Sequence, residues 1–444
     1  MTKYIDLNEL SKIKAEYCSD TKNTSVRHAL TNVGMNEVVS SLDDVSSSHF
    51  TFSLDIKTLP VCDQKRSGRC WIFSACTILR EIVASKLNIT SQFELSQNFI
   101  SYYDKIEKYN YQMEGVIREI LNGKEPSDRT MSYLLSGVSD GGQWDMFKAL
   151  VKKYGIVPKS VFPETFQSNN TKLQTTLCDS IFRQFAVSAY KEKDKGIDRL
   201  EEIKAEYFKK IYSVITSCFG IPVEKFDFSY KDTKGDYHLE RDLTPKSFFD
   251  KYVGDEIDEY VSIISAPTKD KEYYHLYTID LVGNVIGGDE ITHLNLPFER
   301  MEELIIKQLK DNKIVWFGSD VSYYLDRQDG VWSLEAFDYQ SAFDADIAFP
   351  KEDMLDFKQS AMNHAMVITG VDLVDDKPTK WKIENSWGST YGSSGYFVMS
   401  ESFFSLFVYQ AAIRKEYLND RELEALKGEK TILPPWDPFG TLAD

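Results

Sequence analysis

The fold of this 444-residue chain is decided by the stretch Gln64-Lys65-Arg66-Ser67-Gly68-Arg69-Cys70-Trp71-Ile72-Phe73. Cys70 stands at the start of a segment with helical periodicity, whose apolar face continues through Ala75, Ile78, Leu79, Ile82, Val83 and Leu87. Gly68 allows an unusual backbone conformation in the turn before the helix. The first N–H groups of a helix have no intrahelical acceptor and favour negative charge, so they stabilise a thiolate. The stretch therefore predicts a cysteine nucleophile with a lowered pKa.

A candidate base for this thiol lies far along the chain. The segment Asn363-His364-Ala365-Met366-Val367-Ile368 places a histidine directly ahead of an apolar strand, and a strand end holds a side chain rigidly. The next predicted strand, Trp381–Glu384, runs into Asn385-Ser386-Trp387-Gly388. The Asn385 amide can fix the imidazole tautomer, and Trp387 can shield that hydrogen bond from water. Nucleophile, base and orienting residue together predict a Cys-His-Asn triad.

These segments resemble the papain superfamily of cysteine peptidases, in the chain order Cys, His, Asn. Three details resemble the bleomycin hydrolase and aminopeptidase C family in particular. Arg69 stands where papain-like enzymes usually have Ser, a long segment separates Cys70 from His364, and Pro435-Trp-Asp-Pro-Phe-Gly-Thr-Leu-Ala443 lies at the C-terminal end. The likeness covers essentially the whole chain. It implies an α+β fold of two papain-like subdomains, one helical and one β-barrel-like, with the cleft between them.

The resemblance also implies roles for individual residues. Cys70, His364 and Asn385 are the expected catalytic residues, and Gln64 is the expected side-chain donor of an oxyanion hole that the Cys70 N–H completes. Gly141-Gly142 is expected to line the cleft, because a missing Cβ lets a substrate backbone approach; a simple helix-entry loop is the alternative. The residues expected to bind substrate are Gly141, Gly142, Asn363, Ala365, Trp387, Ala443 and Asp444.

Other interpretations of the same residues remain open. A free cysteine is often a small buried hydrophobe, Gln64 can be a solvated loop residue, and Asn385 can be a turn residue after a strand. The remaining histidines, at positions 28, 49, 238, 275 and 293, are not part of a motif like the one around His364. A transglutaminase-like acyl transferase, an endopeptidase of the same family and a non-catalytic scaffold are the alternative functions. Asn385 followed by Ser-Trp-Gly weighs against the transglutaminase, whose third residue is Asp.

Four segments are expected along the chain. Residues 1–165 form an N-terminal segment and a helical catalytic subdomain, 166–345 an insertion, 346–420 a β-rich catalytic subdomain, and 421–444 a C-terminal arm. Within them the patterns predict a helix over 146–154, an amphipathic helix around 200–214, a hairpin at 234–235, a helix opened by Thr244-Pro245, and strands near 260–265, 275–282, 314–318, 365–371, 381–384 and 396–399. By resemblance, the insertion joins subunits into a homohexameric ring.

The C-terminal segment cannot be helical over Leu433–Pro438 and yet carries Trp436, Phe439 and Leu442. It is either a surface arm packed on its own subunit or an arm that runs into the cleft. The resemblance implies the second, with the chain terminus on the non-primed side facing the ammonium group of a substrate, which gives aminopeptidase action on peptides with a free N-terminus. Asp444 lies one residue beyond the Leu-Ala end of related arms, so it is either trimmed or shares this role.

Composition is that of a large globular enzyme, with 42% hydrophobic and 27% charged residues. The net charge of −17 does not predict a nucleic-acid partner, because such binding depends on cationic contacts. There is no signal-peptide pattern and no apolar run of the roughly 18 residues that a membrane span needs, so a cytoplasmic location without a membrane partner is expected. The six cysteines are scattered, so we expect them to be reduced thiols. The sequence contains no C-x-x-C pair, so no metal site is predicted, and no cofactor is implied.

Overall fold

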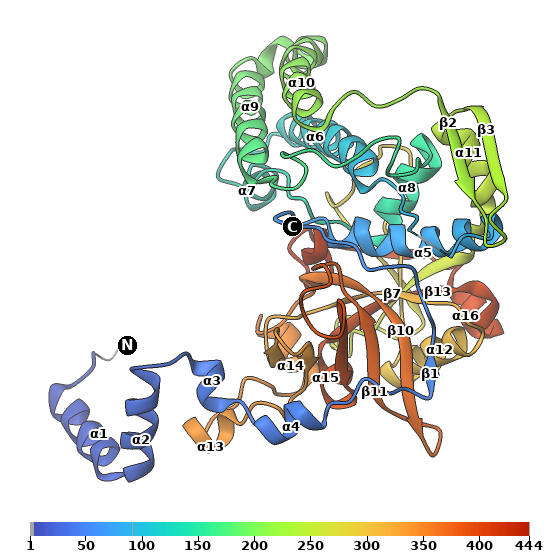
Figure 1. Cartoon of the computed structure of the whole chain (residues 1–444). Coiled ribbons are helices and arrows are strands. Elements are labelled where there is room, and N and C mark those ends of the chain that lie inside the picture. The colour runs from blue at the N-terminus through green and yellow to red at the C-terminus, as the bar shows by residue number, and fades with distance from the viewer. Residues whose placement is uncertain (1–3, 91, 444) are drawn as a thin grey trace.

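A helical lobe and a sheet lobe meet along helix α5 in the computed structural model, which describes residues 4–90 and 92–443 (Figure 1). The helical lobe contains α5 (Cys70–Leu87), α6 (Gln97–Leu121), α7 (Arg129–Leu134), α8 (Trp144–Tyr154), α9 (Lys172–Lys191), α10 (Ile197–Phe219), α11 (Pro245–Tyr252) and the hairpin β2 (Phe226–Lys231) and β3 (Tyr237–Leu243). The α+β class and the two-subdomain architecture expected from the sequence are confirmed.

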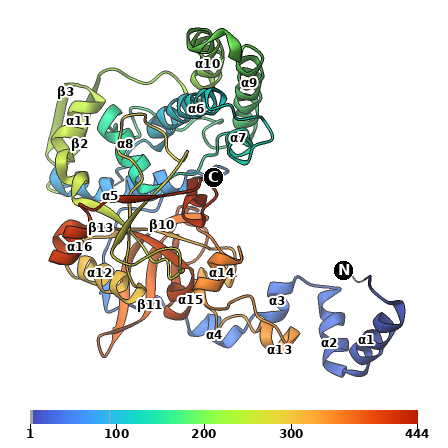
Figure 2. The same ribbon diagram turned by 180° about the vertical axis from the view of Figure 1, so that it is seen from behind.

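Twelve strands of the described residues form one sheet in the other lobe. Their order is β14 (Lys430–Leu433), β5 (His275–Ile279), β6 (His293–Asn295), β4 (Tyr260–Ile264), β13 (Val408–Arg414), β7 (Val315–Ser319), β10 (His364–Val374), β11 (Lys377–Glu384), β12 (Tyr396–Ser400), β9 (Val331–Trp332) and β8 (Leu325–Asp326), with β1 (Leu54–Asp55) paired to β10. The helices of this lobe are α12 (Phe298–Lys310), α13 (Tyr339–Phe343), α14 (Lys351–Asp356), α15 (Glu401–Phe407) and α16 (Asp420–Ala425). Figure 2 shows α12 and α16 at the end of the lobe opposite the N-terminal arm.

Helix α5 is apolar on nearly all sides because both lobes cover it. Most of its residues, from Cys70 to Leu87, are buried, and it contacts β10 and β7 of the sheet as well as α6 and α8 of its own lobe. Asn88 ends the helix in the left-handed conformation with φ of 53°. The nucleophile candidate is therefore mounted on the element around which the two lobes pack.

Strands β10 and β11 run antiparallel, and this direction brings two distant motifs together. Val367 pairs with Glu384, while His364 pairs with Ser319 of β7. The first residue of β10 and the residue that follows β11 therefore meet at the same edge of the sheet, beside α5. The two strands are almost entirely buried at this end.

The predicted elements of the long middle segment are present. The structure contains the hairpin of β2 and β3, helix α11 with Thr244 as its N-cap, and strands β4, β5 and β7 close to their expected positions. Residues 166–345 supply α9 and α10 to the helical lobe, and also β4 to β9, which belong to the same sheet as β10. The division of the chain into four functional segments stays a prediction.

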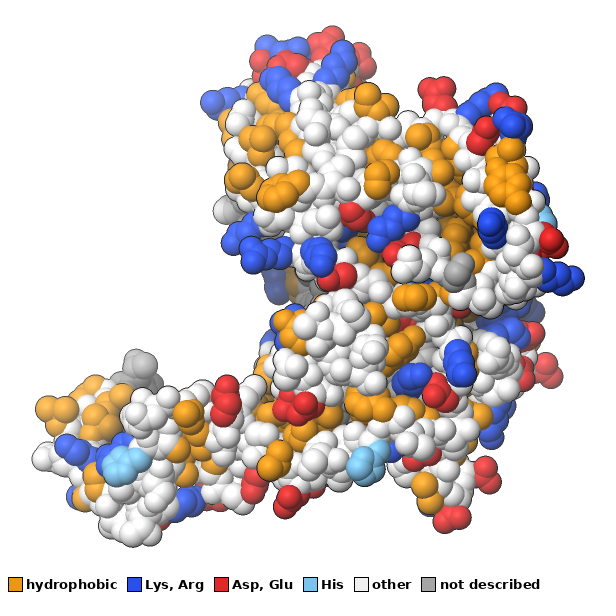
Figure 3. All heavy atoms as spheres, in the orientation of Figure 1, with side chains coloured by type: hydrophobic (Ala, Val, Ile, Leu, Met, Phe, Trp, Pro, Cys, Tyr) orange, Lys and Arg blue, Asp and Glu red, His pale blue; other side chains and the backbone are white. Residues whose placement is uncertain are grey.

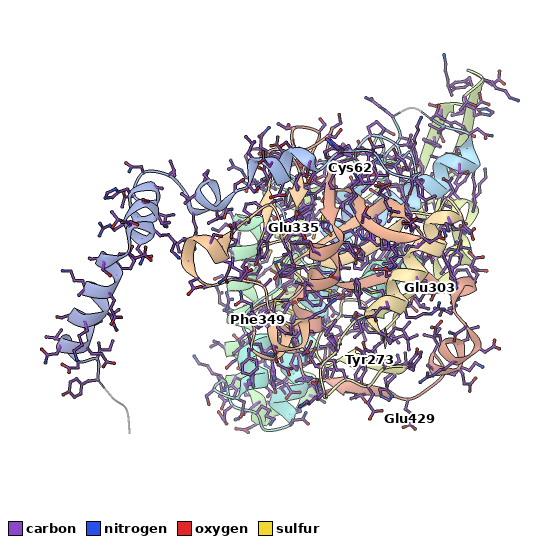
Figure 4. All side chains as sticks on the ribbon, turned by 90° about the horizontal axis from the view of Figure 1, so that it is seen from below. Cys62, Tyr273, Glu303, Glu335, Phe349 and Glu429 are labelled. Carbon is purple, nitrogen blue, oxygen red and sulfur yellow. The ribbon has the colours of Figure 1, made fainter. Side chains whose placement is uncertain are left out.

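The N-terminal residues form an arm of four helices, α1 (Leu7–Ser19), α2 (Thr21–Leu30), α3 (Met35–Val39) and α4 (Leu42–Ser47). Helices α1 and α2 pack on each other and extend away from the sheet lobe, as Figures 1 and 3 show. None of the residues of α1 or α2 is buried, and in the view of Figure 4 their side chains project freely. Among the described residues, no helix has the length and apolar character needed to cross a membrane.

Candidate active site

The turn before Cys70 is held by buried polar contacts. Arg69 is 1% exposed and its guanidinium pairs with Glu164 at 3.0 Å, while its Nε donates to Ser67 Oγ at 2.9 Å. The N–H of Gly68 donates to Asp140 Oδ2 at 3.1 Å, and a Cβ on Gly68 would lie 2.9 Å from the Asp140 Cβ. The arginine that replaces the usual serine is thus an internal brace, which fixes where helix α5 and its first residue begin.

His364 and Asn385 are hydrogen-bonded to each other, as the sequence motifs predict. His364 Nε2 lies 2.9 Å from Asn385 Oδ1, and the Trp387 ring stacks on the imidazole with centroids 5.1 Å apart and planes at 28°. Because an amide oxygen only accepts, Nε2 carries the proton and Nδ1 is left as the basic nitrogen. The Asn385 oxygen also accepts the Ser386 N–H at 2.8 Å, which fixes the amide.

The thiol of Cys70 contacts the strand that carries the histidine. Its sulfur accepts the main-chain N–H of Ala365, the residue after His364, at 3.4 Å. Burial raises the pKa of Cys70 to about 11, and the N–H groups of Ala365 and Trp71 oppose that rise. Burial likewise lowers the pKa of His364 to about 4, with the Asn385 hydrogen bond raising it and the charge of Arg327 lowering it further.

The predicted low pKa of Cys70 is therefore wrong for this form of the protein. The sulfur does lie at a helix N-terminus, but Cys70 is only 4% exposed, and loss of hydration disfavours the thiolate more than the N–H groups favour it. Burial favours the neutral form of both Cys70 and His364.

Gln64 is fixed beside this pair by contacts to both sides of the site. Its Nε2 donates to Ser67 O at 2.6 Å, and its Oε1 accepts the Ser386 hydroxyl at 2.6 Å. Its main-chain N–H donates to Ser386 O at 2.8 Å. The structure thus brings Gln64 next to the residue that follows Asn385, with its amide oriented.

The two glycines of the Gly141-Gly142 pair meet the end of the chain. The Gly142 N–H donates to the carbonyl oxygen of Leu442 at 2.8 Å, and a Cβ on Gly141 would lie 2.4 Å from that oxygen. Ser139 Oγ donates to Ala443 O at 2.7 Å. The backbone of the C-terminal arm therefore lies where an extended substrate was expected to pair; Asp444 is outside the described residues.

The arm is anchored before it reaches the glycines. Lys271 and Asp437 form an ion pair at 3.0 Å in which both side chains are buried. Gln143 Nε2 donates to Phe439 O at 3.0 Å, and Thr441 Oγ1 donates to Met362 O at 2.8 Å. In Figure 1 the chain end lies between the lobes, beside α5.

Asn363 and Trp387, two further residues expected to bind substrate, differ in placement. The Asn363 side-chain amide donates to Asp320 at 2.6 Å and to Ser322 at 2.7 Å, so it orders the loop before β10. Trp387 is partly exposed beside His364. The structure thus gives the Asn363 side chain a loop-fixing contact, while the Trp387 ring faces the triad.

Two arginines near the site were not predicted. Arg80 is 1% exposed; it donates to the carbonyl oxygens of Leu59 and Pro60 and pairs with Glu384 at 3.2 Å, one residue before Asn385. A charged residue inside the apolar run of α5 was a signal for such a buried pair. Arg327 lies over the Trp387 ring at 4.6 Å, and its turn carries no comparable sequence signal.

Comparisons with known proteins agree with this geometry. A model of the peptidase C1-like family matches residues 4–440. Aminopeptidase C of Lactobacillus delbrueckii subsp. lactis is 44% identical over 399 residues, 88% of each chain, and aminopeptidase C of Lactobacillus helveticus is 41% identical over 449 residues, covering 100% of this chain and 99% of the relative. The crystal structure of pepw from Lactobacillus rhamnosis HN001 superposes with a TM-score of 0.96 at 42% identity, covering 99% of both chains.

Proposed function

The chain belongs to the peptidase C1-like family and is a cysteine aminopeptidase, and we propose that Cys70, His364 and Asn385 carry out its reaction. One observation supports these roles above the others. The imidazole is hydrogen-bonded to Asn385 at 2.9 Å on the strand whose next N–H contacts the Cys70 sulfur. Base and nucleophile are thereby held on facing elements of the two lobes.

The reaction we propose uses side chains of this protein and one water molecule. His364 Nδ1 takes the Cys70 proton as the sulfur attacks the first peptide carbonyl, and Gln64 Nε2 and the Cys70 N–H receive the oxyanion. The C–N bond breaks when the imidazolium gives its proton to the leaving amine. Water then attacks the acyl-enzyme, with His364 as base, and releases the N-terminal residue and the thiol.

The C-terminal arm is proposed to limit the enzyme to N-terminal residues. The pairing of Leu442 with Gly142 fills the position that an upstream substrate residue would take. A substrate with a free N-terminus can then extend only one residue past Cys70, and a carboxylate at the chain end would attract its ammonium group. Gly141, Gly142, Ala443 and Asp444 are assigned to this boundary.

Asn363, Ala365 and Trp387 are proposed to hold the substrate around the scissile bond. Support comes from the Ala365 N–H at 3.4 Å from the sulfur and from the Trp387 ring on His364. The loop that Asn363 orders precedes β10 directly and borders the same cleft.

A homohexamer and a cytoplasmic location are proposed from the resemblance to the bleomycin hydrolase and aminopeptidase C family. The N-terminal arm supports an assembly, because Leu10, Ile13 and Tyr17 are 41–55% exposed on a helix that buries no residue. Light scattering of the purified protein, with and without residues 1–33, measures the assembly. The net charge of −17 does not favour a nucleic-acid partner.

Peptide products test the proposed function. The enzyme should release single residues from a free peptide and should leave its N-acetylated form intact, and Cys70→Ser should abolish the release. Cleavage of the acetylated peptide at internal bonds would favour an endopeptidase. Transfer of the acyl group to an added amine, in place of hydrolysis, would favour the transglutaminase-like alternative.

A further inference from the structure

Arg327 is a cation mounted on the aromatic wall of the active site. It lies in the turn between β8 and β9, and its guanidinium is 4.6 Å from the centroid of Trp387 and 4.5 Å from that of Tyr391. Trp387 is the residue that stacks on His364, with centroids 5.1 Å apart. The Trp387 ring therefore lies between the Arg327 guanidinium and the imidazole of the proposed base, in contact with both.

This guanidinium has no carboxylate partner among residues 4–90 and 92–443. Other arginines of the same lobe or the cleft, such as Arg80 and Arg300, each hold a glutamate. The acidic neighbour Asp326 instead accepts the main-chain N–H of Asp329 at 2.9 Å. Because no carboxylate of the described residues pairs with it, this guanidinium is available to bind an anion.

The turn that carries Arg327 is fixed to the loop after Trp387. The Gly392 N–H donates to Gln328 O at 3.0 Å, and the Gly330 N–H donates to Asp326 O at 3.0 Å. Tyr391, which stacks on the guanidinium, belongs to the same loop as Gly392. The arginine is thus held in place before any ligand binds, which lowers the entropic cost of binding.

The position of the C-terminal arm decides which part of a substrate can reach this arginine. Within residues 438–443, the end of the arm forms hydrogen bonds with Ser139, Gly142, Gln143 and Met362, and none with Arg327 or Trp387. The arm therefore fills the side of the N-terminal residue, and the leaving peptide must extend along Trp387. An extended chain advances about 3.3–3.6 Å per residue, so the second or third residue after the scissile bond comes level with Arg327.

We propose that Arg327, stacked on Trp387 and Tyr391, binds a carboxylate on the leaving-group side of the substrate. Its chemical sources are the α-carboxylate of a short peptide and the side chain of an aspartate or glutamate near the scissile bond. The planar guanidinium offers parallel donors to either source. This proposal rests on the proposed function, because it assumes that the peptide is cleaved at Cys70.

The test compares substrates that share one N-terminal residue. They are a tripeptide with a free carboxylate, the same tripeptide as the C-terminal amide, a tripeptide amide with glutamate as its third residue, and an aminoacyl coumarin amide. The wild type should cleave the free tripeptide with about tenfold higher kcat/KM than its amide, the lower end of the effect of a charged hydrogen bond. Arg327→Gln should remove this preference, and Arg327→Lys should keep part of it.

The matched control is Arg421→Gln, since Arg421 also stacks on a tyrosine, Tyr274, but belongs to α16, which lies at the end of the sheet lobe opposite the N-terminal arm (Figure 2). It should leave every ratio unchanged. A change in the basicity of His364 would alter kcat/KM for all substrates by the same factor. The ratio of kcat/KM for the free tripeptide to that for its amide therefore reports carboxylate binding alone.

If Arg327→Gln lowers kcat/KM only for the free tripeptide, Arg327 binds the α-carboxylate. If it lowers kcat/KM only for the glutamate peptide, Arg327 binds the glutamate side chain. Equal ratios in wild type and Arg327→Gln overturn the proposal, whereas a wild type that cleaves none of the four substrates overturns the proposed function instead.

Discussion

The sulfur of Cys70 lies 3.4 Å from the main-chain nitrogen of Ala365, across the boundary between the two lobes. Because Ala365 follows His364 directly, one contact sets the position of the nucleophile relative to its base. The distance between the lobes is in turn set by the packing of α5 against β10 and β7. Residues that brace this boundary therefore control the chemistry without contacting substrate.

Gln64→Ala should lower kcat by roughly 10²–10³, the usual loss for one oxyanion donor. The matched control is Ser386→Ala, which removes the hydrogen bond to Gln64 Oε1 and leaves the Nε2 donor in place. The control should lose much less activity. Steady-state hydrolysis of an aminoacyl coumarin amide measures both, and an unchanged kcat in Gln64→Ala would remove Gln64 from the mechanism.

Asn385→Ala should reduce kcat less than His364→Ala, because Asn385 orients the imidazole and transfers no proton. The loss should come with a change in the pH profile, since the hydrogen bond to Asn385 raises the pKa of His364. Without this bond the pKa falls further below about 4, so the acid limb of the profile should move to lower pH, which rates measured from about pH 3 to 7 show. Equal losses in the two variants would indicate either structural collapse or a different orienting residue.

Stability should fall in mild acid because of His364. Its pKa is about 4 in the folded protein and 6.5 in the reference state, so between these values the unfolded chain binds the extra proton and stability rises with pH. Over the whole window this amounts to roughly 3 kcal/mol, and between pH 7 and pH 5 to roughly 2 kcal/mol.

The comparison that isolates this contribution is wild type against His364→Gln. The variant should lose about 2 kcal/mol less than the wild type between pH 7 and pH 5, as measured by urea unfolding. All other titrating groups, including buried His293, are common to both proteins. Parallel pH dependence in the two proteins would show that His364 keeps its ordinary pKa.

The Arg80–Glu384 pair should be costly to break. Arg80→Met leaves a buried carboxylate one residue before Asn385, and removal of one partner of a buried pair typically costs about 3–5 kcal/mol. The double variant Arg80→Met with Glu384→Met should regain part of this loss. The control is Arg199→Met, because the Arg199–Glu192 pair is exposed and screened by water, so its loss should change stability little.

Urea midpoints of the four proteins give the comparison. Equal destabilisation by Arg80→Met and Arg199→Met would mean that water reaches the buried pair. A double variant less stable than Arg80→Met would show that the side chains act by packing and not by charge.

The sequence predicted the parts of the site that short motifs encode. Cys70, His364 and Asn385 each precede or follow an apolar segment whose period identifies a helix or strand, so the element that carries each residue could be inferred. Arg80 inside the apolar run of α5 signalled a buried pair, but no motif identifies Glu384 as its partner or places Arg327 over Trp387, because these contacts depend on tertiary packing. The pKa of Cys70 was mispredicted for the same reason, since its burial depends on tertiary packing that no local pattern encodes.

The glycine pair also has a consequence that can be measured. A Cβ on Gly141 would lie 2.4 Å from Leu442 O and 3.2 Å from Ala443, so Gly141→Ala should displace the end of the arm. The expected result is weaker preference for free N-termini with the triad intact. The control is Gly123→Ala on the surface, where no atom lies within 4 Å; the strain of its φ of 76° is local to that turn.

Removal of residues 441–444 tests the arm directly, and this cut leaves the buried Phe439 and the Lys271–Asp437 pair in place. The truncated enzyme should cleave N-acetylated peptides and internal bonds, because the backbone that pairs with Gly142 is gone. Its Cys70 should react faster with iodoacetamide, since hydration of the cleft lowers the thiol pKa from about 11. The full-length control Thr441→Val loses the hydroxyl that donates to Met362 O and Pro438 O, keeps the arm backbone, and should keep one-residue release. If mass spectrometry shows that the truncated enzyme still releases single N-terminal residues alone, the limit on substrate length comes from the cleft walls and not from the arm.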